Sequence, residues 1–140
     1  MTLLFLCVAN SARSQIAEGL ARELFGSRAL VLSAGSIPSG KVHPHAVAVM
    51  KEIGIDISKQ YSKSIDALNL TSNESVNFVI TLCAEEVCPT FFGPAQRLHW
   101  GLPDPAAVTE SEAAQLESFR STRDAIQNKL IEFKSEILRD

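Results

Sequence analysis

The sequence is poor in cysteine, tyrosine and tryptophan, and it has no excess of basic charge. Its 140 residues include three cysteines, one tyrosine and one tryptophan, and 13 basic against 16 acidic side chains give a formal net charge of −3. A sparse, odd set of cysteines is unlike the disulfide framework of a small secreted protein. The acidic balance also lacks the basic surface that broad nucleic-acid binding requires. We therefore expect cytosolic thiols and no nucleic-acid partner.

Long hydrophobic runs are missing as well. The apolar start at residues 1–8 is short, has no basic residues before it and continues directly into polar residues. It therefore does not fit a secretory signal, and no later run is long enough to cross a membrane. A hydrophobic fraction of 46% with 21% charged residues is typical of a globular domain, and no repeat or linker divides the chain. We expect a single domain over residues 1–140, monomeric, cytoplasmic and without membrane contact.

Apolar runs alternate with stretches of helical periodicity along the chain. Strands are predicted at residues 3–8, 29–32, 78–82 and, more weakly, 97–100. Helices are predicted at residues 11–25, 44–54, 62–68 and 110–138, with a loop at 101–109. Strands that alternate with helices predict an α/β fold with a parallel sheet, in which ligands bind beyond the carboxyl ends of the strands. All three cysteines follow or end predicted strands, so we expect the chemistry at the edge of the sheet formed by the carboxyl ends of the strands.

The loop after the first predicted strand has the form cysteine, five residues, arginine, serine. It comprises Cys7, Val8, Ala9, Asn10, Ser11, Ala12, Arg13 and Ser14. A loop that enters a helix directs backbone N–H groups into a concavity, and Arg13 can bind a tetrahedral oxyanion through two parallel hydrogen bonds. The same field favours the thiolate form of Cys7, to which the Ser14 hydroxyl can donate. A lone cysteine at a strand end is usually an inert core residue, but the surrounding pattern here favours a nucleophile.

This loop resembles the signature of the low-molecular-weight tyrosine phosphatases and of the arsenate reductases built on the same fold. The resemblance covers nearly the whole chain and implies one catalytic domain, a three-layer α/β sandwich with a central four-stranded parallel sheet in the order 2-1-3-4. It implies that residues 8–14 bind the oxyanion, that Ser33 and Asn10 brace the loop, and that Glu18 supports it from behind. Both families share the loop, so the loop alone leaves both activities open.

Two further stretches resemble the arsenate reductases more than the phosphatases. Cys83 ends a predicted strand in the sequence Thr-Leu-Cys, and Cys88 follows shortly before a proline, as in the thioredoxin-coupled reductases. Residues 99–106 read His-Trp-Gly-Leu-Pro-Asp-Pro-Ala, which resembles a reductase stretch and implies that Asp104 is the general acid. An aspartate before a proline is also common in turns. The phosphatases usually place aromatic residues after the matching Asp-Pro, and this chain has Ala106 and Ala107.

The resemblance to thioredoxin-coupled arsenate reductases implies reduction of arsenate to arsenite by three thiols in turn. Cys7 attacks arsenic, Cys83 attacks the sulfur of Cys7, and Cys88 then forms a disulfide with Cys83. Thioredoxin, or else glutaredoxin or a low-molecular-weight thiol, would reduce that disulfide. Phosphate or sulfate could occupy the loop in place of arsenate. Two alternatives remain, a tyrosine or small-molecule phosphatase with a phosphocysteine intermediate and a non-catalytic oxyanion-binding regulator.

No cofactor and no metal centre are expected. The cysteines lack the close spacing of a zinc site. His43 and His45, on either side of Pro44, are expected at the surface. Lys63 lies where some relatives carry an acidic residue near a bound monovalent cation. We therefore expect no cation requirement, because the ammonium of Lys63 could itself supply positive charge.

Overall fold

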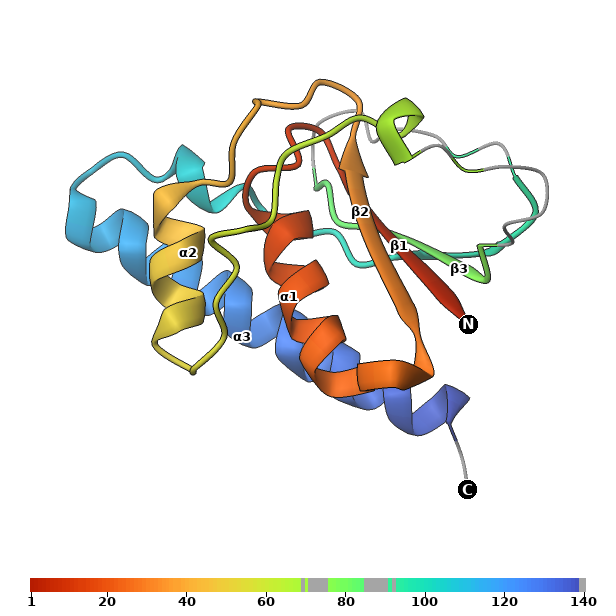
Figure 1. Cartoon of the computed structure of the whole chain (residues 1–140). Helices are drawn as coiled ribbons and strands as arrows, with labels where there is room; N and C mark the ends of the chain where they lie inside the picture. The colour runs from red at the N-terminus through yellow and green to blue at the C-terminus, as the bar shows by residue number, and fades with distance from the viewer. Residues whose placement is uncertain (69, 71–75, 85–90, 92, 139–140) are drawn as a thin grey trace.

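The computed structural model describes residues 1–68, 70, 76–84, 91 and 93–138. Its centre is a sheet of four parallel strands in the order β2-β1-β3-β4, which confirms the predicted order (Figure 1). The strands are β1 (Thr2–Cys7), β2 (Leu30–Gly35), β3 (Phe78–Thr81) and β4 (Gln96–His99). β1 lies between β2 and β3 and is buried almost throughout, as its continuous apolar sequence predicts.

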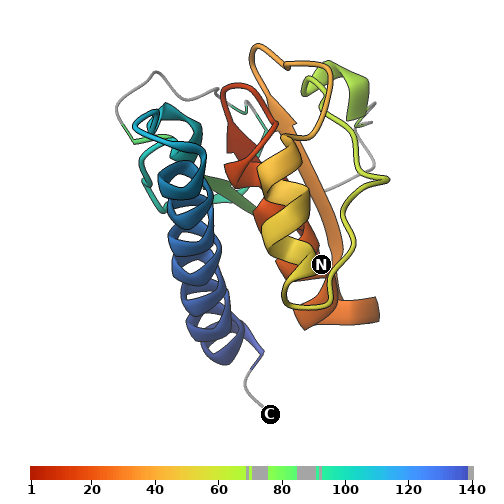
Figure 2. The same cartoon turned by 90° about the vertical axis from the view of Figure 1, so that its left-hand side faces the viewer.

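Three α-helices cover one face of the sheet. They are α1 (Arg13–Phe25), α2 (Pro44–Lys51) and α3 (Glu112–Ile137). Leu3 and Phe5 of β1 point to this face and pack with Ile16 of α1, Met50 of α2 and Phe119 of α3. In Figure 2 the helices face the viewer. The long α3 lies beside α1 and α2, and all three helices lie in front of the strands. The main core therefore lies between β1 and the helices.

The opposite face of the sheet carries a smaller apolar cluster. Leu4 and Leu6 alternate with the residues of the main core, and they pack there with Val79 of β3. Ile65 and Leu68 cover this cluster from the segment that contains the short 3-10 helix η2 (Asp66–Leu68). The described chain thus forms three layers, with the helices on one side and a thinner layer on the other.

Several predicted boundaries shift. β2 was expected to end at Leu32, but it continues through Ser33 to Gly35 and pairs with Phe5–Cys7. The helix predicted over 62–68 is reduced to η2, and the loop predicted over 101–109 contains the 3-10 turn η3 (Pro105–Ala107). A further 3-10 turn, η1 (Gly26–Arg28), follows α1. Within the described part of the chain, no helix has the length and apolar character needed to cross a bilayer.

The end of β2 must be small because the loop after β1 passes directly over it. A Cβ atom added to Gly35 would clash with the carbonyl oxygen of Val8 and lie 2.9 Å from the amide nitrogen of Asn10. Gly35 also donates its N–H to Lys63 O over 2.9 Å. This glycine therefore lets three segments meet at the carboxyl edge of the sheet, where the candidate site lies.

Candidate active site

Cys7 is the last residue of β1, and its thiol is free and buried. The turn into α1 brings Ser14 back to it, so that Cys7 Sγ and Ser14 Oγ are 2.8 Å apart. Both side chains are almost completely inaccessible to solvent. The predicted nucleophile and the predicted hydroxyl donor are therefore in direct contact.

The neighbours of Asn10 fix the orientation of its side-chain amide, which also contacts Ser14. Asn10 Oδ1 accepts from the backbone N–H of Lys63 (2.9 Å) and from Gln15 Nε2 (3.0 Å). Its amide nitrogen must then face the other way, and it donates to Ser14 Oγ (2.7 Å) and Ser33 Oγ (3.0 Å). Asn10 holds this position with a φ of 48°, a left-handed conformation that asparagine tolerates better than most residues.

Ser14 can therefore act as a donor to Cys7. Its oxygen accepts from Asn10, which leaves its single hydrogen available for the sulfur. A hydroxyl donor at 2.8 Å binds a charged thiolate sulfur more strongly than a neutral thiol sulfur. The hydrogen-bond network thus places a hydroxyl group directly against the predicted nucleophile.

The backbone of the loop is turned so that its amides face inward. The carbonyl groups of residues 8–11 accept hydrogen bonds from donors outside the loop. These donors are Ile37 N to Val8 O, Ser39 N and Ser62 Oγ to Ala9 O, Gln15 Nε2 to Asn10 O, and His43 N to Ser11 O. Because each C=O points opposite to the next N–H across a planar peptide, the following amides point into the loop. Inward amides at the start of a helix form a concavity for an oxyanion.

Arg13 lies at the entry of α1, and only 5% of it is exposed. Its Nη1 donates to Leu102 O over 2.9 Å, which joins the anion loop to the segment after β4. That segment contains Asp104, which is partly buried and whose Oδ1 accepts from Ala106 N (3.0 Å) to cap η3. The structure therefore gives Asp104 the turn role that its sequence also suggested. Asp104 follows two positions in sequence after Leu102, the residue that Arg13 contacts.

Cys83 lies just beyond β3 and is fully buried. Leu6 pairs with Thr81, and Leu82 N donates to Leu6 O over 2.9 Å, so Cys7 and Cys83 follow neighbouring strands at the same edge. Cys88 lies outside the described residues. Of the three cysteines predicted to act, the structure therefore brings Cys7 and Cys83 to the ends of adjacent strands, with Cys7 as a free thiol and Cys83 in a disulfide.

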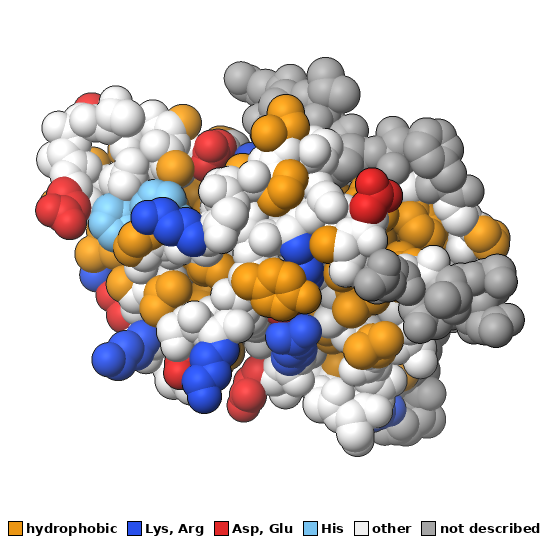
Figure 3. Space-filling model, turned by 45° about the horizontal axis from the view of Figure 1, so that its top comes forward, with side chains coloured by type: hydrophobic (Ala, Val, Ile, Leu, Met, Phe, Trp, Pro, Cys, Tyr) orange, Lys and Arg blue, Asp and Glu red, His pale blue; other side chains and the backbone are white. Residues whose placement is uncertain are grey.

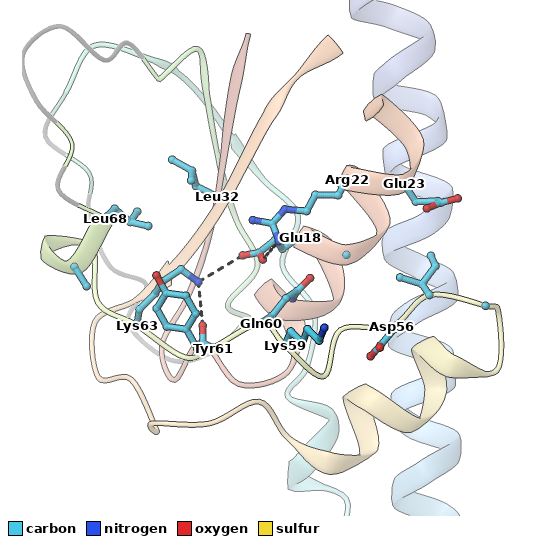
Figure 4. A pocket seen from close by; sticks show the side chains of 14 residues that line it. Glu18, Arg22, Glu23, Leu32, Asp56, Lys59, Gln60, Tyr61, Lys63 and Leu68 are labelled. Atoms are coloured by element: carbon cyan, nitrogen blue, oxygen red, sulfur yellow. Dashed lines mark hydrogen bonds and ion pairs between the residues drawn. The ribbon is translucent and has the colours of Figure 1, made fainter. Parts of the chain in front are cut away.

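Ser33 and Glu18, which were predicted to support the loop, are in direct contact with each other. Ser33 Oγ donates to Glu18 Oε1 over 2.6 Å, and Glu18 Oε2 pairs with Arg22 Nη1 at 2.7 Å. Lys63 Nζ approaches the same carboxylate at 3.5 Å (Figure 4). Burial lowers the pKa of Lys63, and the charge of Glu18 opposes that shift. In the described part of the chain, no three His, Cys, Asp or Glu side chains gather as a metal site.

Gln15 and His43 contribute to the site although the sequence did not single them out for it. Gln15 Nε2 joins Asn10 to Tyr61 O (2.9 Å). His43 was expected at the surface together with His45, and this was wrong, because both are partly buried and their rings contact Phe119. His43 caps α2 by accepting from His45 N (3.0 Å). Its position before Pro44 was the one available signal for this role.

The surroundings of the site carry no single sign of charge. Figure 3 shows the end of the molecule at which the strands finish, where basic, acidic and hydrophobic side chains are interspersed. With a net charge of −3 on the whole chain, attraction of an anion depends on the loop amides and Arg13.

Comparisons with known proteins agree with this architecture. Residues 2–140 match the family described as low molecular weight phosphotyrosine protein phosphatase. An arsenate reductase of Bacillus subtilis (strain 168) is 44% identical over 131 residues, which cover 92% of this chain and 91% of that protein. A solved arsenate reductase in the phosphate binding state has a TM-score of 0.78 and 34% identity, with 97% of this chain and 98% of the other covered. A solved thioredoxin-dependent arsenate reductase of Corynebacterium glutamicum has a TM-score of 0.72 and 29% identity, covering 98% of this chain and 61% of the other.

Proposed function

The chain belongs to the low molecular weight phosphotyrosine protein phosphatase family, and from its similarity to arsenate reductases we propose that it is an arsenate reductase, converting arsenate to arsenite. The observation that carries the proposal is the pairing of Cys7 with Ser14 beneath a loop of inward-facing amides, beside a second buried cysteine at the next strand end. Residues 8–14 bind the oxyanion, with Arg13 as the charged donor. Arsenate, phosphate and sulfate are tetrahedral anions that suit such a loop.

The first step forms a bond between sulfur and arsenic. The Cys7 thiolate attacks arsenic(V) held by the loop amides and Arg13, and one arsenate oxygen leaves as water. Asp104 supplies a proton to that oxygen, a role supported by its place two residues from Leu102, the residue that Arg13 contacts. Ser14 holds the thiolate before the attack, through its hydrogen bond to Cys7.

The next steps transfer two electrons to arsenic. The Cys83 thiolate attacks the sulfur of Cys7, the S–As bond breaks with its electron pair on arsenic, and arsenite leaves. The Cys88 thiolate then attacks Cys83, which releases the Cys7 thiolate and leaves a disulfide between Cys83 and Cys88. Two thiols are oxidised and one arsenic(V) is reduced, so the electrons balance. Because Cys83 is fully buried, its segment must move for this exchange.

An external dithiol must reduce that disulfide, and thioredoxin is the partner that we propose. The thioredoxin-dependent relative supports this choice over glutaredoxin or a low-molecular-weight thiol. We also propose that residues 1–140 act as one monomeric catalytic domain in the cytoplasm, where such reductants maintain free thiols.

Phosphoester hydrolysis is the second candidate, and the family match favours it. In that reaction Cys7 forms a phosphocysteine, Asp104 protonates the leaving alcohol, and water releases phosphate. It requires neither Cys83 nor Cys88, which makes the two functions separable.

Replacement of Cys83 by serine distinguishes the two reactions. We expect Cys83→Ser to lose multiple-turnover arsenate reduction by at least about 100-fold, because the variant lacks the thiol that attacks the sulfur of Cys7 and displaces arsenite. The assay couples arsenate to thioredoxin, thioredoxin reductase and NADPH. Any hydrolysis of p-nitrophenyl phosphate by the same variant should continue, whereas the control Cys7→Ser should lose both reactions. Arsenate reduction at the unaltered rate in Cys83→Ser would contradict the proposal.

A further inference from the structure

Lys63 has a buried ammonium group, which is rare for a lysine. Only 8% of the residue is exposed. Its Nζ donates to Tyr61 O over 3.0 Å and lies 3.4 Å from Ser33 Oγ and 3.5 Å from Glu18 Oε1. Nζ also lies 4.6 Å from the centre of the Tyr61 ring (Figure 4). A carboxylate, a hydroxyl, a backbone carbonyl and a ring face therefore surround one positive charge.

These groups are the ones that a desolvated monovalent cation requires. Burial of an ammonium is unfavourable unless such partners replace water. Lys63 belongs to neither apolar core, so polar groups and not core side chains form its surroundings. The backbone of the same residue is also tied to the anion loop. Lys63 N donates to Asn10 Oδ1 (2.9 Å), and Lys63 O accepts from Gly35 N (2.9 Å).

A short chain of hydrogen bonds leads from this charge to the nucleophile. Ser33 Oγ donates to Glu18 Oε1 (2.6 Å), so it offers its lone pairs to Lys63 Nζ and to Asn10 Nδ2. Asn10 in turn donates to Ser14 Oγ, the group that contacts Cys7.

Without Lys63, the negative charge of Glu18 would face the hydrogen bonds of Ser33 and Asn10 with little compensation. Its other partner, Arg22, has a side chain that is 52% exposed, so solvent screens that pair. The buried ammonium of Lys63 therefore offsets the negative charge at the end of the network closest to Ser33.

We infer that the Lys63 ammonium is a tethered monovalent cation, which holds the Glu18–Ser33–Asn10 network in the geometry that keeps Cys7 reactive. Lys63 is thus a positioning residue, acting through Ser33 and Asn10. A free metal cation does not fit in the same place, because Nζ already occupies the centre of the donor set. No step of the reaction involves a metal ion at this position.

The variant Lys63→Met removes the charge of Lys63, keeps an unbranched side chain in its place, and tests the link to Cys7. In Lys63→Met we expect iodoacetamide to alkylate Cys7 about three- to tenfold more slowly near neutral pH, because the Glu18–Ser33–Asn10 network that orients Ser14 against Cys7 loses the positive charge that holds it. The rate is followed at the Cys7 peptide by mass spectrometry. Lys59→Met is the matched control, since Lys59 lines the same solvent-open pocket but is exposed. In this control, Cys7 should be alkylated at the rate found for the unaltered protein.

Replacement by an acid tests whether a free cation can take over. Lys63→Asp leaves two carboxylates around the position of Nζ, next to a pocket of about 560 Å³ through which ions can enter. We expect potassium chloride to raise the melting temperature of this variant by about 3–8 °C relative to choline chloride of equal ionic strength, and to speed alkylation of Cys7. The unaltered protein and Lys59→Asp should respond equally to both salts.

Three results would overturn the inference. They are unchanged alkylation of Cys7 in Lys63→Met, a Lys63→Asp variant that gains nothing from potassium over choline, and an unaltered protein that itself requires potassium. If Lys63→Asp does not fold in choline, the Lys63→Met measurement alone decides. None of these readouts involves arsenate turnover, so the outcome is independent of the proposed function.

Discussion

The surroundings of Cys7 are organised by side chains that do not touch its sulfur. Ser14 contacts the thiol while its oxygen accepts from Asn10, and Asn10 is oriented because its own oxygen accepts from Gln15 and Lys63. Each of these groups has one arrangement in which its donors and acceptors are all used. We therefore expect a substitution in this hydrogen-bond network to alter the surroundings of Cys7 without touching its sulfur.

Acidification should weaken the fold through His43. Burial lowers the pKa of His43 from its ordinary value of 6.5, His45 and Lys41 act in the same direction, and Asp104 opposes them. The unfolded chain, in which the imidazole has its ordinary pKa, then binds more protons than the folded chain in the window just below pH 6.5. The stability linked to His43 is therefore complete above that pH and is lost as the pH falls through the lower folded pKa.

The measurement is the free energy of unfolding in urea between about pH 7.5 and about pH 5. His43→Asn is the matched variant, because its side-chain oxygen can keep the helix cap that His43 Nδ1 provides and does not titrate. We expect a smaller loss of stability on acidification in His43→Asn than in the unaltered protein. Equal losses would mean that other groups account for the pH dependence.

Sequence reasoning found the residues of the loop because their pattern is local. Cys7, Arg13 and Ser14 lie within eight positions, and the loop geometry follows from that spacing. The contacts of Gln15 and His43 were not predictable in this way. Gln15 reaches Tyr61 O, and His43 N reaches Ser11 O, across distances in sequence that no local pattern describes.

At the scale of elements, strand and helix order was predictable and some boundaries were not. The alternation of apolar runs and helical spacing predicted the parallel sheet, and the resemblance implied its order. The residues Ser33–Gly35 have the composition of a turn, yet they extend β2 because they continue the ladder with Phe5–Cys7. Tertiary pairing thus overrides local propensity at this point, and it is the extension that carries Ser33 and Gly35 to the anion loop.

Arg123 forms hydrogen bonds between α3 and the end of α2. Its Nη1 donates to Val49 O (2.8 Å) and to Glu52 Oε1 (2.8 Å), so it joins the end of α2 to the middle of α3. Arg123→Met should lower the free energy of unfolding by about 2 kcal/mol, because it leaves a buried carbonyl without its donor. Arg120→Met is the control. Arg120 also binds Glu52, but its side chain is 34% exposed, so its loss should cost less.

Urea unfolding of both variants supplies the comparison. The interpretation predicts a lower midpoint for Arg123→Met than for Arg120→Met, with similar slopes. If the two variants were equally destabilised, the ion pair with Glu52, which both arginines make, would be the main contribution. The carbonyl of Val49 would then contribute little.

At the scale of the whole molecule, the parallel sheet is what assembles the site. Cys7, Gly35 and Leu82 all end or follow strands at one edge, and Arg13 connects that edge to the segment after β4 through Leu102. Because the loop, the support behind it and the β4 segment are joined in this way, we expect an anion bound in the loop to be coupled to the ends of the sheet. We therefore expect anion binding and global stability to be linked.

This linkage predicts that phosphate stabilises the entire fold. A ligand that binds only the folded state at about 100 times its Kd adds about 2.7 kcal/mol to the free energy of unfolding, which appears as a rise in melting temperature. We expect phosphate, and arsenate under the same conditions, to produce such a rise beyond that of potassium chloride at equal ionic strength. In Arg13→Lys the rise should shrink, because an ammonium keeps the charge but loses the planar pair of donors. Cys7→Ser should keep most of the rise, because the amides and Arg13, and not the sulfur, hold the anion. An equal rise in Arg13→Lys would show that the anion binds elsewhere, and an equal rise in potassium chloride would show general screening by salt.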